Sequence, residues 1–176
     1  MFRFTFCVSI FFFLFSFSQN KYKNDQREGY WEGYYETGQL RYSGFFENGK
    51  EKGVFKYYYK SGNLEKELLY ITPGIYAKVK MYYSNKLIKV LGEYCLKQRC
   101  GTWEYFNDIG KIICKENYKN GVLDGDYIIY FDGILTDFYT YKHNKKNGIS
   151  KSFFLSGNTK IISNYFNNKL NGEYVA

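Results

Sequence analysis

Hydrophobic and polar residues recur along the chain with a period of 24 residues. A glycine opens nearly every period, and these openers are Gly29, Gly53, Gly101, Gly125, Gly148 and Gly172, with Ala77 in the remaining slot. One residue is deleted after Asp126. A fixed period of this length is typical of repeat architectures, in which each unit packs on its neighbours. The pattern predicts six repeats, starting near residues 29, 53, 77, 101, 125 and 148, and the start of a seventh near residue 172.

Three columns of apolar residues run through the repeats, at five, eleven and seventeen residues after each opener. The first column is Tyr34, Tyr58, Tyr82, Phe106, Tyr130 and Phe153. The second is Leu40, Leu64, Ile88, Ile112, Leu135 and the polar Thr159, and the third is Phe46, Tyr70, Tyr94, Tyr118, Tyr141 and Tyr165. Because alternate residues of a strand share a face, we expect these columns to form one face and to stack as cross-strand pairs. Tyr58 is accordingly predicted to pack in the core.

Each repeat holds two strand-like segments around a second turn glycine, such as Gly38, and closes on a polar turn. The dipeptides Asn48-Gly49 and Asn120-Gly121 supply the positive φ angles that tight hairpin turns require. Strands joined by turns this short are antiparallel, because a parallel crossover needs a dozen or more residues. The predicted fold is all-β, a single elongated, twisted antiparallel β-meander of about six hairpin repeats. The third repeat lacks both glycines and follows "ITPGIY" (71–76), where we expect a bulge or a bend.

Positions between the three columns are also rich in aromatic residues. A single sheet covers only one of its faces unless another element packs on it. We therefore expect the second face to be an exposed, amphipathic interaction surface, because Tyr and Trp suit protein interfaces. Its candidate contact residues are Trp31, Tyr57, Tyr59, Trp103 and Tyr105.

Three segments, "GYWEGYYETGQLRYSGFFENGKEKG" (29–53), "GVFKYYYKSGNLEKE" (53–67) and "GTWEYFNDIGKIICKENYKNGVLDG" (101–125), resemble MORN-type repeats in their bacterial variant form. The resemblance extends over residues 29–176. It implies a scaffold associated with membrane occupation and protein contact. Some bacterial variants are labelled antitoxin-like, and that role conflicts with the export signal described next.

The amino terminus, "MFRFTFCVSIFFFLFSFSQN", combines a cation at Arg3 with an apolar run and small residues before Gln19. This pattern is typical of a cleaved signal peptide, and the run is shorter than the ~20 apolar residues of a membrane-spanning helix. We predict a signal peptide over residues 1–18, a short linker over residues 19–28 and a repeat domain over residues 29–176. The mature protein is then expected in the periplasm, on the outer cell surface or secreted.

The chain has a formal net charge of +8, and residues 138–172 contain no Asp or Glu. One interpretation is a solvated face that keeps an aromatic-rich sheet soluble. The other is a basic strip that binds an anionic membrane surface or polysaccharide through Lys142, Lys145, Lys146 and Lys151. Nucleic acid is disfavoured as a partner, because the chain has only four arginines and its signal predicts export.

Few residues carry chemistry. Cys95 and Cys100 flank the turn "LKQR" and are the candidate disulfide of an oxidising compartment, with Cys114 as a small hydrophobic residue; three free thiols are the alternative. Cysteine spacing disfavours a metal site, and we expect no cofactor. The single histidine, His143, lies in a predicted exposed turn, and no catalytic motif is present, so we expect no catalytic residues and no enzyme.

Two functions follow from these patterns. The first is an exported, non-enzymatic repeat scaffold that binds a protein partner through its aromatic-rich sheet. The alternative is a peripheral cell-envelope module that binds anionic lipid or polysaccharide through the lysine-rich carboxy-terminal repeats.

Overall fold

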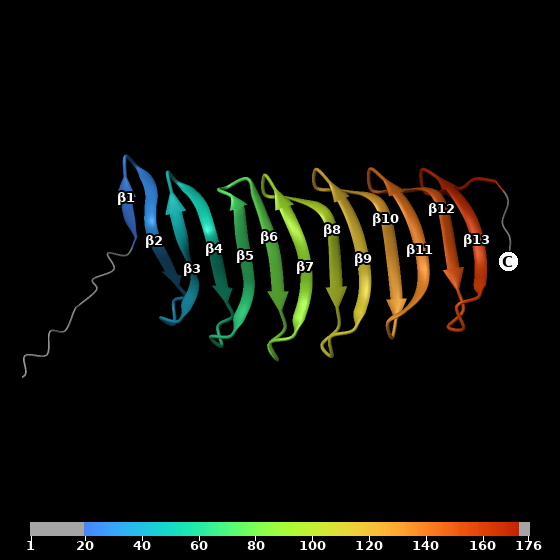
Figure 1. Cartoon of the computed structure of the whole chain (residues 1–176), viewed down its shortest axis with the longest axis horizontal. Helices are drawn as coiled ribbons and strands as arrows, with labels where there is room; N and C mark the ends of the chain where they lie inside the picture. The colour runs from blue at the N-terminus through green and yellow to red at the C-terminus, as the bar shows by residue number, and fades with distance from the viewer. Residues whose placement is uncertain (1–19, 173–176) are drawn as a thin grey trace, which may run out of the picture.

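The structure, a computed structural model, describes residues 20–172 as one antiparallel sheet of 14 strands that pair in sequence order (Figure 1). The strands are β1 (Lys21–Lys23), β2 (Gln26–Tyr34), β3 (Leu40–Glu47), β4 (Lys50–Tyr58), β5 (Leu64–Thr72), β6 (Tyr76–Tyr82), β7 (Ile88–Cys95), β8 (Gln98–Phe106), β9 (Ile112–Lys119), β10 (Val122–Phe131), β11 (Ile134–Lys142), β12 (Lys145–Phe153), β13 (Thr159–Phe166) and β14 (Lys169–Leu170). The predicted all-β meander of six hairpins is confirmed. The predicted signal peptide lies outside the described residues.

The segment predicted to be a linker belongs to the sheet. β1 pairs with β2 through Lys21↔Glu28 and Lys23↔Gln26, and the turn between them places Asn24 and Asp25 at positive φ. Asn and Asp tolerate that conformation, so a hairpin forms without an Asn-Gly signal. The Tyr22 ring meets Trp31 edge-on at 5.0 Å, which fixes β1 on the sheet.

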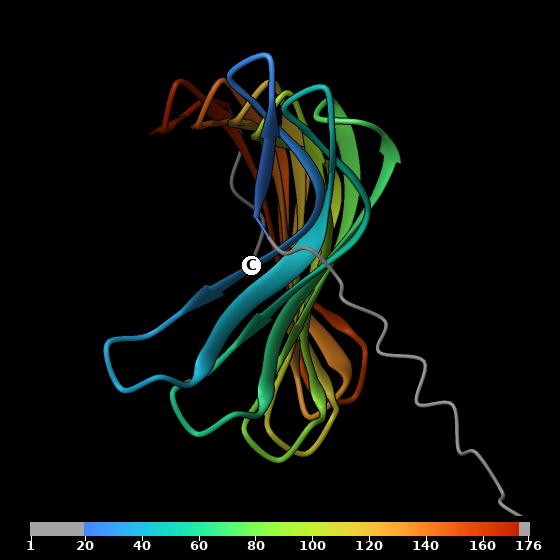
Figure 2. The same cartoon turned by 90° about the vertical axis from the view of Figure 1, so that its left-hand side faces the viewer.

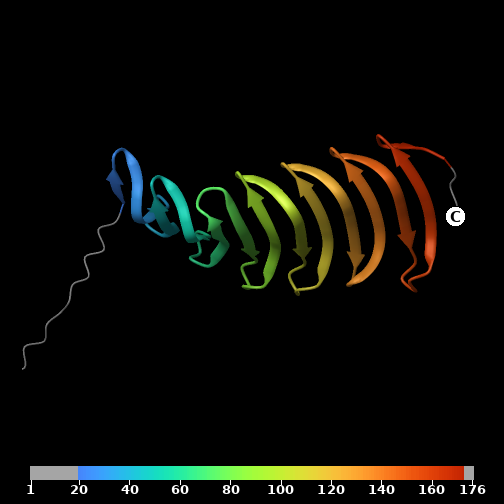
Figure 3. The ribbon, with the colours of Figure 1, turned by 45° about the horizontal axis from the view of Figure 1, so that its top comes forward.

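The sheet is long, twisted and open. Seen along its length, the strands arch and rotate progressively (Figure 2). The tilted view shows the same rotation, with the first hairpins turned relative to the last (Figure 3). Right-handed twist is intrinsic to strands of L-residues, and a bulge in each hairpin increases it.

The bulge also decides which residues share a face. In the first hairpin Tyr34 pairs with Leu40 but Gly33 pairs with Tyr42, so Arg41 is an extra residue on β3. The later hairpins shift register at the same place. Side-chain alternation is therefore reversed between the eleventh and thirteenth positions after each opener. The prediction that the three apolar columns share one face is wrong. It assumed that side chains alternate regularly along the strand, whereas the extra residue in the bulge places the third column on the opposite face from the other two.

The core contains residues of the third column, residues two positions after the openers, and Leu68, Ala77 and Val90 from other positions on the same face. Its buried members are Trp31, Phe46, Phe55, Leu68, Ala77, Val79, Val90 and Trp103. Consecutive rings meet edge to face, with centroids 5.8 Å apart for Trp31 and Phe46 and 5.0 Å apart for Phe46 and Phe55. We call this side of the sheet the core face and the opposite side the outer face. Tyr58 lies on the outer face, so its predicted core position is wrong.

Neighbouring repeats pair large residues with small ones across the core face. An added Cβ at Gly44 would lie 2.4 Å from the Phe55 ring, and one at Gly92 would lie 2.4 Å from the Trp103 ring. Leu68 instead faces the smaller Val79. The Phe55 and Trp103 rings thus lie directly on the backbone of the previous repeat, which packs them closely within one layer.

The opener glycines form the junctions between repeats. Between Lys52 and Lys56, β4 has two more residues than the facing part of β3, and Gly53 lies in this bulge at a φ of 65°. Gly101, Gly125 and Gly148 lie in equivalent bulges at positive φ. Ala77 pairs regularly with Tyr70, and the expected irregularity of the third repeat is confirmed as a bulge at Ile71. A glycine is needed where the junction bulges, because a Cβ strains the left-handed conformation.

We predict that Gly44→Ala lowers the free energy of unfolding by about 1–3 kcal/mol, because its Cβ would overlap the Phe55 ring. Urea denaturation measures the change. Adding Phe55→Leu to Gly44→Ala should cost less than the two single changes together, since the smaller side chain relieves the overlap. Additive costs, or a neutral Gly44→Ala, would contradict this packing.

Candidate functional site

A column of side chains covers the core face, two residues before each opener. The Arg27 guanidinium lies over Trp31 and Phe46, at 4.8 and 5.2 Å from the ring centroids. Arg99 lies over Trp103 and Tyr118 at 4.5 and 5.2 Å. Lys146 Nζ lies 3.6 Å from the centroid of Tyr139 and 5.4 Å from that of Tyr165. We call these three residues the roof cations. Their long stems cover apolar rings while the charges interact with the π faces.

Arg99 is the centre of a polar network above the Trp103 ring. Its Nη1 donates to the hydroxyls of Tyr105 and Tyr118, each at 3.0 Å. Both hydroxyls donate to Glu116 Oε2, at 2.6 and 2.9 Å, and this carboxylate lies 3.8 Å from Arg99 Nη1. Burial raises the pKa of Tyr105 and of Tyr118, and the hydrogen bond to Glu116 raises both further. Both charged groups, the Arg99 guanidinium and the Glu116 carboxylate, have hydrogen-bond or ion-pair partners within the network, so the network stabilises the fold. It contains no unpaired acid or base.

The residues predicted to form an exposed interaction face lie elsewhere. Trp31 and Trp103 are buried in the core, and Trp103 is 0% exposed. Tyr57 and Tyr105 are half-buried against the same core. Tyr59 lies at a hairpin turn and donates its hydroxyl to the Tyr82 carbonyl at 2.8 Å. Trp31, Tyr57, Trp103 and Tyr105 face the core, because the bulge in each hairpin places the even positions of the first strand on the same face as the third column. Tyr59 instead links two repeats through its hydroxyl.

The Tyr59 bond belongs to a ladder between repeats. Tyr35 donates to the Tyr58 carbonyl at 2.6 Å and Tyr83 donates to the Phe106 carbonyl at 2.7 Å, both across 23 residues. Each bond connects one hairpin turn to the next hairpin. The three bonds therefore link the hairpin turns of the first three repeats, each to the next hairpin.

The outer face carries an apolar patch that sequence analysis missed. The positions one and sixteen residues after each opener are cross-strand pairs, and in the third and fourth repeats these pairs are polar: Lys78↔Glu93 and Thr102↔Asn117. In the first two repeats the pairs are apolar: Tyr30↔Phe45 and Val54↔Leu69. These four side chains are between 37% and 46% exposed. We call these four residues the apolar outer patch. The sequence signal for it was that the positions one and sixteen residues after the opener are apolar in the first two repeats and polar in the third and fourth.

The four candidate lysines do not form one strip. Lys142 and Lys145 pair across the hairpin turn, and Lys151 lies on the same outer face, opposite Phe138 and Ile162. Lys146 points to the core face as a roof cation, where burial lowers its pKa. Three of the four lysines therefore lie on the outer face: Lys142 and Lys145 form an exposed basic group, and Lys151 is half-buried further along β12.

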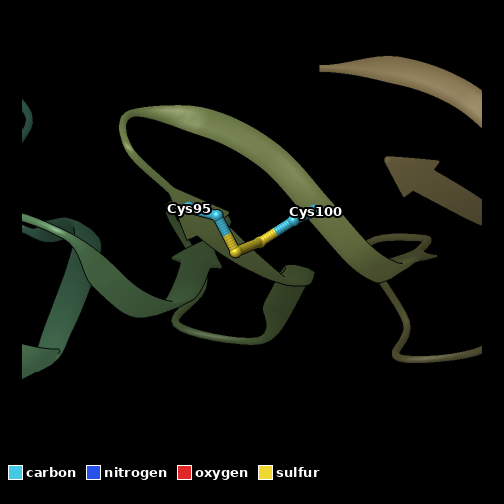
Figure 4. Close-up of a disulfide and its surroundings, with 2 residues drawn as sticks. All are labelled: Cys95 and Cys100. Carbon is cyan, nitrogen blue, oxygen red and sulfur yellow. A yellow bond between two sulfur atoms is a disulfide. The ribbon is translucent and has the colours of Figure 1, made fainter. Parts of the chain in front are cut away.

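Cys95 and Cys100 are disulfide-bonded across the turn that joins β7 to β8 (Figure 4). Their Cα atoms are 5.8 Å apart, within the usual range for a disulfide. Cys114 is a half-buried free thiol whose pKa is raised by burial. The disulfide staples the third hairpin to the fourth at the turn opposite the tyrosine ladder.

The described residues bring together no catalytic constellation. His143 is exposed in a turn, with Nε2 4.0 Å from an Asp124 carboxylate oxygen. Within residues 20–172 no three His, Cys, Asp or Glu side chains are placed to hold a metal ion. Over the same residues no helix has the length and apolarity needed to cross a membrane.

We predict that stability is complete below about pH 10 and falls as the pH rises further, because the folded state holds the tyrosine protons more tightly than the unfolded chain does. Denaturant unfolding between about pH 8 and pH 11 measures the slope. Tyr105→Phe should reduce the slope, whereas Tyr22→Phe, which removes an exposed hydroxyl, should leave it unchanged. An equal slope in all three proteins would contradict the network's role.

Comparison with known proteins assigns the repeats. The family model described as MORN repeat variant matches residues 27–50, 51–71 and 99–120, which correspond to the first, second and fourth hairpins. No curated protein matches the chain. A crystal structure of TarM is 13% identical over 66% of this chain and 20% of the TarM chain, and its TM-score of 0.33 is too low to bear on fold or function. Three of the six hairpins are therefore identified as MORN variant repeats.

Proposed function

We propose that the protein is an exported, non-enzymatic repeat scaffold that binds a protein partner through the apolar outer patch. The observation that carries this proposal is the pair of exposed apolar cross-strand pairs, Tyr30↔Phe45 and Val54↔Leu69, on neighbouring hairpins of one rigid sheet. A contiguous apolar surface rimmed by polar residues marks an interaction site more often than it serves the fold. The aromatic pair adds large contact area with few torsions to freeze.

The charge of the chain indicates that a different protein occupies the patch. The whole chain has a formal net charge of +8, which opposes close approach of a second copy. Beside the patch, Lys56 and Lys78 are exposed on the same face, and each is paired across the strands with a glutamate, Glu67 and Glu93 respectively. We therefore assign the patch to a different protein that presents an apolar surface and carries a net negative charge. Opposite net charge accelerates association.

Export is part of the proposal. The Cys95–Cys100 disulfide supports it, because disulfides persist in oxidising compartments and are rare in the cytosol. A cytoplasmic antitoxin role does not agree with an exported protein. The MORN assignment supports the scaffold role.

We predict that a photoreactive amino acid at position 45 or 69 cross-links one acidic partner in an envelope preparation from the source cells. Positions 102 and 117 are matched controls, because they are the same exposed pair in the fourth repeat with polar residues. With the purified partner, Phe45→Ser should weaken binding by about tenfold or more, as expected for a buried aromatic contact.

The result has clear contrary outcomes. Adducts that form equally at positions 102 and 117 would show that the patch has no selectivity. Adducts only between copies of the protein would assign the patch to self-association, and an absence of adducts would remove the proposed site. Equal melting temperatures of Phe45→Ser and the unchanged protein would exclude unfolding as the cause of weaker binding.

A second candidate function, binding to an anionic lipid or polysaccharide, is favoured by the exposed basic group. Lys142 and Lys145 are directly paired like charges, which is unfavourable unless an anion lies between them. Among residues 20–172, neither these two lysines nor Lys151 makes an ion pair.

We predict that replacing Lys142, Lys145 and Lys151 with Gln abolishes co-sedimentation with phosphatidylserine vesicles at low salt, because each lysine near an anionic surface contributes about 1 kcal/mol. Lys146→Gln is the matched control, since Lys146 lies on the opposite face. Binding that needs Lys146 as much as the other three, or no binding by the unchanged protein, would exclude this function.

A further inference from the structure

The column of residues two positions before each opener, which contains the roof cations, is interrupted in the middle of the sheet. Its members are Arg27, Glu51, Ile75, Arg99, Leu123 and Lys146, so the second repeat has a carboxylate where the first and fourth have guanidinium groups. The backbone holds these positions in equivalent places, because each carbonyl accepts a hydrogen bond from the next repeat's turn. Gly49 N–H donates to Arg27 at 3.0 Å, Gly74 N–H to Glu51 at 3.0 Å and Gly121 N–H to Arg99 at 2.9 Å.

Because the second repeat has no roof cation over its rings, the core face is hollowed there. The hollow has a volume of about 280 Å³, and its lining includes Glu51, Tyr57, Tyr70, Ala77 and Tyr94. Ala77, in the slot that elsewhere holds glycine, forms part of the floor and is 1% exposed. The Tyr70 ring packs edge-on against Phe55 at 5.7 Å, as Phe46 packs against Trp31 under Arg27. The ring pair is therefore present in the second repeat and its cation is absent.

The charges and rings around the hollow leave the space beside Glu51 and Tyr70 as the place for a further cation. Glu51 has a side chain only 20% exposed, and its nearest cation is Lys97 Nζ at 3.8 Å, on a side chain that is 75% exposed. Lys66 Nζ is already placed over Tyr57, 4.2 Å from the ring centroid. Among the described residues no cation lies over Tyr70 or Tyr94, whereas Phe46, Tyr118 and Tyr165 each have one.

We propose that this hollow binds the guanidinium group of an arginine side chain from a protein partner, stacked on Tyr70 and paired with Glu51. The chain shows guanidinium stacking of this kind twice within itself, with Arg27 over Phe46 and with Arg99 over Tyr118, and Arg99 is also paired with a carboxylate, that of Glu116. The hollow lies on the face opposite the apolar outer patch, so it is a separate site from the proposed function's surface.

Arginine fits this site better than lysine or an anion. A guanidinium is planar, stacks on aromatic rings and pairs with a carboxylate through two parallel hydrogen bonds. A lysine ammonium also lies over rings, as Lys146 does over Tyr139, but it is not planar, does not pair with a carboxylate through two parallel hydrogen bonds and is more strongly hydrated. Lys66 and Lys97 also border the hollow and would attract a carboxylate. The test must therefore distinguish binding of a cation from binding of an anion.

The test uses four short blocked peptides, Gly-X-Gly with X as arginine, citrulline, lysine or aspartate, titrated into the exported protein at low salt. Backbone NMR shifts in β4 to β7 report binding. We expect saturable shifts with the arginine peptide and at least about tenfold weaker binding of citrulline, which has the same shape without the charge. Tighter binding of the aspartate peptide, equal binding of citrulline, or no saturable shift would overturn the proposal.

Two substitutions at Glu51 sharpen the result. Glu51→Gln should weaken the arginine peptide about tenfold, since it removes the charged partner. Glu51→Arg should abolish binding and raise Tm, because the new side chain supplies the missing roof cation. Glu36→Arg adds the same charge at an exposed turn glutamate that makes no ion pair among the described residues, and it should change neither property. If Glu51→Arg fails to fold, Glu51→Gln alone decides the matter.

The controls also separate this site from the apolar outer patch. Phe45→Ser should leave arginine-peptide binding unchanged, and Glu51→Gln should leave cross-linking at position 69 unchanged. Arginine-peptide binding that is lost in Phe45→Ser but kept in Glu51→Arg would place the peptide on the outer face and overturn the inference.

Discussion

The structure depends on burying large aromatic rings on a sheet that has no second layer. A sheet needs a partner surface to hide its apolar face, and within residues 20–172 every strand belongs to the same sheet. The rings solve this by lying on one another and on glycine backbone, as Trp103 lies on Gly92 and is fully buried. Roof cations and tyrosine hydroxyls then cover the rings from the solvent side. Burying a ring this fully stabilises the folded state by about 1.5–3 kcal/mol. The backbone hydrogen bonds between strands alone would not provide this stabilisation.

Glycine has two separate physical roles in this arrangement. The opener glycines adopt positive φ in junction bulges, which aim the next aromatic residue at the core. Gly44 and Gly92 instead provide space for a ring to contact the backbone. Where Ala77 replaces an opener, it pairs regularly with Tyr70, the bulge lies at Ile71, and the smaller Val79 occupies the position that holds a large ring in the first, second and fourth repeats. The hollow in the roof occurs at that same place.

Much of the fold could be predicted from sequence, because the period, the turn glycines and the short connections are local signals. The face assignment could not be predicted by counting alternate residues, because the bulge at Arg41 and its equivalents reverses alternation inside every hairpin. Trp31 and Trp103 were therefore placed on the wrong side, and Tyr59 was taken for a contact residue although its hydroxyl ties two repeats. The β1 strand was missed because Asn24 and Asp25 make its turn without glycine. The apolar outer patch became visible only when register showed that positions one and sixteen are opposite each other.

Packing differs along the sheet while the hydrogen-bond ladder does not. All buried apolar side chains of residues 20–172 lie between Trp31 and Trp103, and the buried core-face residues further along are Ser150 and Ser163. Amide hydrogen exchange of the native protein measures which contribution holds the sheet together, because it reports the free energy of opening for each strand. If the roofed aromatic face is what stabilises the molecule, amides of β2 to β9 will exchange most slowly and those of β10 to β13 distinctly faster. Equal protection in all six hairpins, or slowest exchange in the last two, would show that the backbone ladder and not the aromatic face holds the sheet together.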